Sequence, residues 1–126
     1  MRGFTLDTGA LIALERGEER VIAMLDRALT TPGATVNIPA GVLAQAFRDG
    51  SRQVSLTRLL KDHRTSVVAL DHVLARVVGI LLGARGGSDV VDASVVICAR
   101  RYRQPAVTSD PEDLRRLDPD LPLEVI

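Results

Sequence analysis

The stretch Gly3-Phe4-Thr5-Leu6-Asp7 indicates the fold class of this chain of 126 residues. A short extended run ends in an aspartate, and a helical pattern over residues 9–16 follows at once. The stretch Ala106-Val107-Thr108-Ser109-Asp110 has the same arrangement near the other end of the chain. Because short strands that lead into helices are the units of parallel sheets, the two stretches predict an α/β protein.

The rest of the chain alternates short strand-like runs with longer helical patterns. We predict strands at about residues 3–7, 35–38, 66–70, 106–108 and 123–126. We predict helices at about residues 9–16, 18–30, 39–49, 52–62, 72–85, 89–102 and 111–118. The chain has no linker or internal repeat, so residues 1–126 are expected to form one domain.

The composition excludes several classes of protein. A hydrophobic share of 46% fits a globular protein, and 16 acidic residues balance 16 basic ones, so no net field draws the chain to nucleic acid or membranes. The longest apolar run, Val77–Ala84, is too short to cross a bilayer. A single cysteine, Cys98, excludes an intramolecular disulfide and predicts a reducing, cytoplasmic location.

Four aspartates are the candidate functional residues: Asp7, Asp89, Asp92 and Asp110. Each alone is explained equally well as a helix cap or as an acid in the first turn of a helix. Taken together they favour a site, because the carboxyl ends of parallel strands share one edge of the sheet. Oxygen ligands without a His or Cys cluster suit Mg²⁺ or Mn²⁺ rather than zinc.

Other kinds of phosphate chemistry lack their motifs. The glycine-rich segment Gly83–Gly87 has no Lys-Ser or Lys-Thr ending, so it is not a Walker-type loop. No second acid stands two residues after Asp7, as haloacid-dehalogenase-type phosphatases require. Metal-dependent cleavage of a phosphodiester is the simplest remaining use of the four acids.

Three segments resemble the PIN-domain family, and within it the VapC-type toxins of toxin–antitoxin pairs. They are Leu6-Asp7-Thr8-Gly9-Ala10-Leu11-Ile12-Ala13-Leu14-Glu15, Asp89-Val90-Val91-Asp92-Ala93-Ser94-Val95 and Thr108-Ser109-Asp110-Pro111-Glu112-Asp113-Leu114. The similarity in order and spacing extends over essentially the whole chain. The opening and closing motifs are fairly specific in combination and weak separately.

The resemblance implies a three-layer α/β/α sandwich with a mainly parallel five-stranded sheet. It also implies an endoribonuclease that depends on Mg²⁺ or Mn²⁺ and acts on RNA. A cognate antitoxin that blocks the site, and usually a homodimer, belong to the same expectation.

Carried over by position, the resemblance makes Asp7, Asp92 and Asp110 catalytic metal ligands. Asp89 corresponds to an additional acid seen in some members. Three polar residues flank these acids and are expected to orient water, phosphate or substrate: Thr8, Thr108 and Ser109.

One position departs from the family pattern. The second family acid is usually a glutamate on the helix after the second strand, and Gln45 stands in its place here. A neutral amide removes one negative charge, so metal affinity is expected to fall unless Asp89 supplies the missing charge. Arg48, three residues further along, is a candidate contact for RNA phosphate, although a surface ion pair explains it more simply.

The predicted helix 72–85 contains an unusual series of small residues. Ala75, Gly79 and Gly83 recur every four residues along one face. Because each glycine costs about 1 kcal/mol relative to alanine inside a helix, close packing against another helix is expected. That helix belongs either to the same chain or to a second copy across a dimer axis.

Two alternatives to a ribonuclease stay open. The first is a PIN-fold binding module that has lost catalysis and acts through protein partners, a reading that Gln45 supports. The second is a flavodoxin-like signalling domain phosphorylated on an aspartate. That domain would need a lysine near its last strand, whereas the only lysine, Lys61, lies elsewhere.

Overall fold

The computed structural model describes residues 1–126 and confirms an α/β fold with a five-stranded sheet whose strands all run parallel. The strands are β1 Gly3–Leu6, β2 Thr35–Pro39, β3 Thr65–Val68, β4 Ala106–Thr108 and β5 Leu123–Val125. The helices are α1 Thr8–Glu15, α2 Glu19–Thr30, α3 Ala40–Ala46, α4 Val54–Lys61, α5 His72–Arg85, α6 Val90–Tyr102 and α7 Pro111–Leu117.

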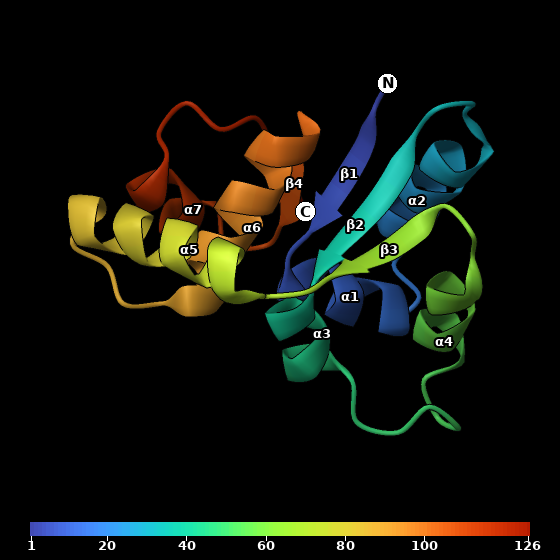
Figure 1. Ribbon diagram of the computed structural model, residues 1–126. Coiled ribbons are helices and arrows are strands. Elements are labelled where there is room, and N and C mark those ends of the chain that lie inside the picture. The colour runs from blue at the N-terminus through green and yellow to red at the C-terminus, as the bar shows by residue number, and fades with distance from the viewer.

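The strand order β3-β2-β1-β4-β5 places β1 at the centre of the sheet. Helices α5, α6 and α7 lie on one side of the sheet, and α2 and α4 lie on the other (Figure 1). From β1 the chain adds β2 and then β3 on one side of β1. It later adds β4 and β5 on the other side of β1. The point of reversal falls between β1 and β4, and parallel sheets bind their ligands beyond the carboxyl ends of the strands at such a point.

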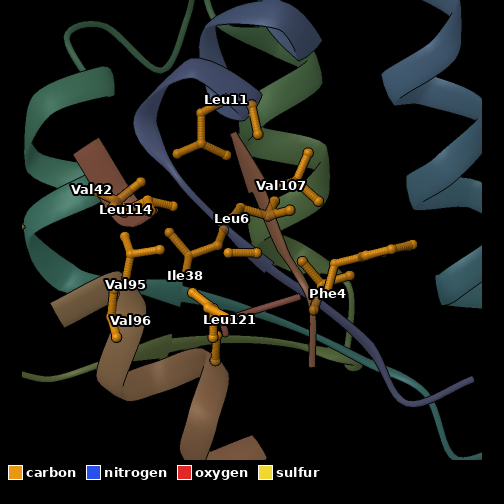
Figure 2. Packing of buried hydrophobic residues seen from close by; sticks show 14 of the residues in the cluster. Phe4, Leu6, Leu11, Ile38, Val42, Val95, Val96, Val107, Leu114 and Leu121 are labelled. Atoms are coloured by element: carbon orange, nitrogen blue, oxygen red, sulfur yellow. The ribbon is translucent and has the colours of Figure 1, made fainter. Parts of the chain in front are cut away.

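The hydrophobic core lies between the sheet and both helix layers. All of β1 and β4 is buried, as strands covered on both faces must be. Figure 2 shows Leu6 and Ile38 of the sheet packed between Leu11 of α1 and Val95 of α6. Fully burying each such side chain contributes about 1.5–3 kcal/mol, so the core fixes both helix layers against the strands.

The helix predicted over residues 39–49 is shorter than expected. Pro39 is the last residue of β2, and α3 ends at Ala46 because Phe47 adopts an extended backbone. The side chain of Gln53 stabilises this ending. Its Oε1 accepts hydrogen bonds from the backbone N–H groups of the two residues that follow Phe47, at 2.7 and 3.0 Å. Its Nε2 donates to the carbonyl of Ala46 at 2.8 Å.

The helix predicted over residues 72–85 is confirmed, and it is capped at both ends. Asp71 accepts a hydrogen bond from the N–H of Leu74 at 2.8 Å, and Gly86 ends the helix in the left-handed conformation, with φ of 74°. A Cβ added at either glycine within this helix would meet no atom within 4 Å, so the close neighbour expected there does not come from the same chain. None of the helices combines the length and the apolar composition that a membrane span requires.

Gln104 links three strands at the edge of the sheet opposite the four aspartates. The side chain is 3% exposed, and its Oε1 accepts from the hydroxyl of Thr5 and the amide of Asn37, each at 3.0 Å. Its Nε2 donates to the carbonyl of Arg2 at 2.9 Å and to the carbonyl and hydroxyl of Thr35 at 3.1 and 2.9 Å. Residues just before β4 are thereby tied to β1 and β2.

We expect Gln104→Leu to lower the free energy of unfolding by roughly 3 kcal/mol, because several buried donors and acceptors lose their partner. Urea unfolding monitored by circular dichroism measures the change. The control is Arg101→Ala at the exposed end of α6, which should stay within about 0.5 kcal/mol of the wild type. A loss no larger than that of the control would contradict the role of Gln104.

Candidate functional site

Asp7 lies between the carboxyl ends of the neighbouring strands β1 and β4. The order in which the chain adds strands to the sheet changes direction between these two strands. Only 8% of Asp7 is exposed. Its Oδ1 accepts from the N–H of Thr8 at 2.7 Å, and its Oδ2 accepts from the hydroxyl of Thr108 at 2.9 Å. The Thr108 hydroxyl in turn accepts from the N–H of Asp110 at 2.9 Å. One hydroxyl thus joins the aspartates that follow the two strands.

Asp92 and Asp89 reach the same edge from the start of α6. Asp89 is the N-cap, and its Oδ1 accepts from the N–H of Asp92 at 2.9 Å. Asp92 is in the first turn of the helix and is half-buried. The helix comes close to α3, since a Cβ on Gly41 would lie only 3.1 Å from a methyl group of Val91. This close approach brings the first turn of α6 toward the helix that carries Gln45.

The pKa values show that these carboxyl groups act on one another. Burial, together with the charges of Asp89, Asp7, Asp113 and Asp110, raises the pKa of Asp92 to about 7. Burial also raises the pKa of Asp7, against the lowering effect of its hydrogen bonds from Thr8 and Thr108. The exposed Asp110 has a raised pKa, chiefly through a hydrogen bond with Asp113. The edge is therefore a cluster of like charges, which a cation would relieve.

Asp113 belongs to this cluster, although the sequence analysis did not select it. Its charge raises the pKa values of Asp7, Asp92 and Asp110, and its carboxylate pairs with Arg116 at 2.9 Å. The sequence contained the necessary signal: Asp113 follows Asp110 by three residues at the start of α7, the same spacing as Asp89 and Asp92.

The acids share an edge, but their side chains do not form a finished metal site. No three His, Cys, Asp or Glu side chains are gathered closely enough to hold one metal ion among them. Donors within the protein already occupy both oxygens of Asp7 and one oxygen of Asp89. The donor set still fits Mg²⁺, which commonly keeps several waters and takes only one or two carboxylates directly. Asp7 and Asp92, the two more buried acids, fit that role.

Gln45 lies beside Thr8, the residue that follows Asp7. The hydroxyl of Thr8 donates to Oε1 of Gln45 at 2.5 Å. This contact occupies the amide oxygen of Gln45. The amide nitrogen is the group that Gln45 leaves available, so the side chain offers a hydrogen-bond donor at the edge where a glutamate would offer negative charge.

Ser109 lies next to the acids and packs tightly on α1. A Cβ added at Gly9 would lie 2.1 Å from the hydroxyl oxygen of Ser109, so a residue with a side chain at position 9 would displace it. Ser109 is exposed and lines a hollow of about 280 Å³ together with Gly9 and Arg16. The site is therefore an open edge with a shallow hollow beside it, and not an enclosed pocket.

Arg48 does not lie on the helix face predicted for it. It follows the end of α3, where its Nη1 donates to the carbonyl of Ala44 at 2.9 Å and to that of Phe47 at 2.7 Å. It forms no ion pair. The expected helix would have continued past this residue, but the extended backbone of Phe47 turns the guanidinium back onto the last carbonyls of α3.

No family model and no curated protein matches this chain. Solved structures do match it. VapBC2 from Rickettsia felis, bound to a DNA fragment from its promoter, has 19% identity and a TM-score of 0.72 over 98% of both chains. FitAcB from Neisseria gonorrhoeae has 19% identity and a TM-score of 0.60 over 95% of both. FitAB bound to an IR36 DNA fragment has 18% identity and a TM-score of 0.62 over 98% of this chain and 93% of that one.

These findings correct the identification of the chain as a PIN-domain protein of the VapC type. That assignment rested on three motifs, whereas no family model matches the sequence. The similar solved structures are VapBC and FitAB complexes with 18–19% identity, and at that level they show a shared fold and nothing finer.

We expect the stability of the metal-free protein to fall as the pH rises from about 4 to about 7, because the unfolded Asp92 ionises near 3.8 and the folded one only near 7. Asp92→Asn removes this penalty. At pH 8 the variant should exceed the wild type by about 1–2 kcal/mol, a reduced figure because water screens a half-exposed group.

Urea unfolding of both proteins at pH 4 and pH 8, with EDTA present, measures the effect. The advantage of the variant should be small at pH 4 and should grow toward pH 8. An equal difference at the two pH values would show that Asp92 ionises normally in the folded protein.

Proposed function

We propose that this chain is the toxin of a VapBC-type toxin–antitoxin system and acts as a Mg²⁺- or Mn²⁺-dependent endoribonuclease. The observation that carries the proposal is the gathering of Asp7, Asp92 and Asp110 beyond the carboxyl ends of β1 and β4. Burial and the neighbouring acids raise the pKa values of Asp7 and Asp92, and a hydrogen bond with Asp113 raises that of Asp110. The similar VapBC and FitAB structures support it, since they share this fold over at least 93% of each chain, and the toxin–antitoxin pairing is what the resemblance implies.

The chain's own residues have separate parts in this proposal. Asp7 is held rigidly by Thr8 and Thr108, so its carboxylate is positioned before any ion or substrate arrives. Asp92 is the second ligand, and Asp89 and Asp110 add negative charge around it. When bound, Mg²⁺ or Mn²⁺ lowers the pKa of a coordinated water and offsets charge on the scissile phosphate.

Polar groups around the acids would orient the RNA. The amide nitrogen of Gln45 is available to donate to a phosphate oxygen, since Thr8 occupies the amide oxygen. The exposed hydroxyl of Ser109 and the guanidinium of Arg16 line the hollow beside the acids, where the next nucleotide would lie. Arg48 would reach phosphate only after leaving the carbonyls of α3.

The proposed partners follow from the same system. We propose an RNA substrate, a cognate antitoxin that covers the acidic edge, and a homodimer in the cytoplasm. Residues 1–126 would act as one domain, because one cluster of 26 buried residues draws on both helix layers and the sheet.

A binding module without catalysis is the second candidate. Two observations favour it: Gln45 removes one carboxylate from the edge, and no three acids are gathered around one point. A binding module would bind its partner without cleaving RNA, with Mn²⁺ present or absent. Ribonuclease activity that requires Asp7 and Asp92 therefore separates the two candidates.

We expect Mn²⁺ to raise the melting temperature of the wild type and to activate cleavage of a mixed-sequence RNA, since ion binding relieves the repulsion among the acids. Asp7→Asn and Asp92→Asn should each lose at least about 100-fold in cleavage rate and most of the Mn²⁺-induced shift in melting temperature.

The matched control is Asp26→Asn, an exposed acid on α2. It should keep both the activity and the shift. Cleavage that persists in Asp92→Asn would refute the catalytic assignment. Absence of both cleavage and a shift in the wild type would refute the metal site.

We expect Gln45→Glu to bind Mn²⁺ about 10-fold more tightly than the wild type, because it adds a carboxylate beside Asp7 and keeps an acceptor for the hydroxyl of Thr8. Isothermal titration measures the affinity. Ala44→Glu, which adds the same charge at the neighbouring exposed position of α3, is the control and should bind as the wild type does. Equal affinities in all three proteins would count against a metal-directed role for position 45.

A further inference from the structure

The segment that connects α3 to α4 and continues along α4 carries an excess of positive charge. Within residues 47–61 the charged side chains are the basic Arg48, Arg52, Arg58 and Lys61 and the acidic Asp49. Their net charge is +3, whereas the whole chain has a net charge of zero. All four basic side chains are exposed. Such a local excess on a neutral protein attracts anions, and above all polyanions.

This basic segment, residues 47–61, lies at the same edge of the sheet as the acids. Figure 1 shows the connection between α3 and α4 beyond α1 and α3, at the end of the molecule toward which the strands point. The chain also links the two directly: Gln45, which accepts from the hydroxyl of Thr8 next to Asp7, stands two residues before Phe47. An RNA chain held at the acids can therefore continue along α3 onto the basic segment.

Two of the basic side chains line a hollow on α4. The hollow has a volume of about 270 Å³, and its walls are Gly50, Val54, Thr57, Arg58 and Lys61. Neither Arg58 nor Lys61 forms an ion pair within the chain. Both lie in the last turn of α4, where a cation offsets the helix dipole, but that role requires neither a hollow nor an aromatic neighbour.

An exposed aromatic ring, that of Phe47, lies next to the hollow. Of the other two aromatic residues, Phe4 is 2% exposed in the core and Tyr102 lies under the guanidinium of Arg101. Phe47 is 38% exposed. A Cβ added at Gly50 would lie 3.3 Å from Cζ of Phe47, so the ring rests on the same glycine that lines the hollow. The ring and the hollow therefore form one continuous surface.

Hydrogen bonds within the chain fix the shape of this connection. The side chain of Gln53 bonds the backbone at the end of α3 and just after it. The hydroxyl of Thr57 donates to the carbonyl of Gly50 at 3.2 Å. Asp49 accepts from the N–H and the hydroxyl of Ser51 at 3.0 and 2.7 Å. Because the connection is held before a ligand arrives, binding there costs little ordering of the backbone.

The combination of cations with an exposed ring fits unpaired RNA. Proteins that bind single-stranded nucleic acid use cations along the phosphates and aromatic side chains on which the bases stack. A base inside a duplex is covered by its neighbours, so it does not stack on a side chain. An acidic protein segment would use Arg58 and Lys61 but would give no reason for the exposed ring of Phe47 beside them.

We propose that the basic segment binds single-stranded RNA, with a base stacked on Phe47 and the neighbouring phosphates beside Arg58 and Lys61. The inference rests on the proposed ribonuclease function and specifies the form of its substrate, an unpaired RNA that runs from the acids along α3. None of the acids takes part in this contact, so binding can be measured separately from cleavage.

Fluorescence anisotropy of a short labelled single-stranded RNA measures the affinity, with EDTA present so that no cleavage occurs. Phe47→Leu, which keeps an apolar side chain without an aromatic face, should bind at least about 5-fold more weakly than the wild type, and Phe47→Trp should bind as the wild type does. Arg58→Glu should bind at least about 10-fold more weakly. The control is Arg20→Glu, which changes the net charge equally at an exposed residue of α2 and should keep the wild-type affinity. Urea unfolding confirms that each variant is folded.

A duplex of the same sequence should bind at least about 10-fold more weakly than the single strand. Equal affinity for the two forms, or wild-type affinity in either Phe47→Leu or Arg58→Glu, would overturn the proposed surface even if the protein cleaves RNA. Such a result would leave the basic segment to a protein partner. A wild type that binds the single strand through these residues but does not cleave it with Mn²⁺ would refute the ribonuclease and leave the surface standing. A wild type that binds no RNA would overturn the surface.

Discussion

The hydrogen bond from the hydroxyl of Thr108 to Asp7 is the interaction on which the arrangement of the acids depends. It joins the ends of β1 and β4, the two strands between which the strand order of the sheet changes direction. The same hydroxyl accepts a hydrogen bond from the N–H of Asp110. Without it, two strands a hundred residues apart in sequence would still pair through the backbone. Their aspartates would not be fixed relative to each other. The sheet brings the acids to one edge, and this hydroxyl sets their spacing.

The acidic edge costs the protein stability. Asp92 carries most of that cost, because it is half-buried, faces four other acids and has a pKa of about 7. A structural helix cap has no need of such neighbours: Asp71 caps α5 with one similar hydrogen bond, outside any acidic cluster. Retaining several unfavourable charges at a reversal point is what a site for a cation requires. Gln45 reduces the cost by one charge and replaces it with a donor, which suits phosphate more than metal.

The sequence predicted the fold and the shared position of Asp7 and Asp110, because both follow directly from strands that must run parallel. It also allowed Asp89 as a helix cap, since a cap depends only on neighbouring residues. The place of Arg48 was predicted wrongly because it depends on a contact between segments, the turn that Gln53 fixes after α3. Asp113 was missed although its spacing from Asp110 matches that of Asp89 and Asp92. Its effect on Asp92 arises only because α7 packs beside α6.

The acidic edge and helix α5 meet at one short connection. Only Gly86–Asp89 separates the end of α5 from the start of α6, and Asp89 caps the turn that holds Asp92. Arg85 donates to the carbonyl of Leu117 and Gly86 ends α5 in the left-handed conformation, so the start of this connection is fixed within the chain. Since the charge of Asp89 raises the pKa values of both Asp7 and Asp92, the electrostatics of the edge depend on how firmly that connection is held. The ending of α5 at Gly86 therefore contributes to the arrangement of the acids as well as to the end of the helix.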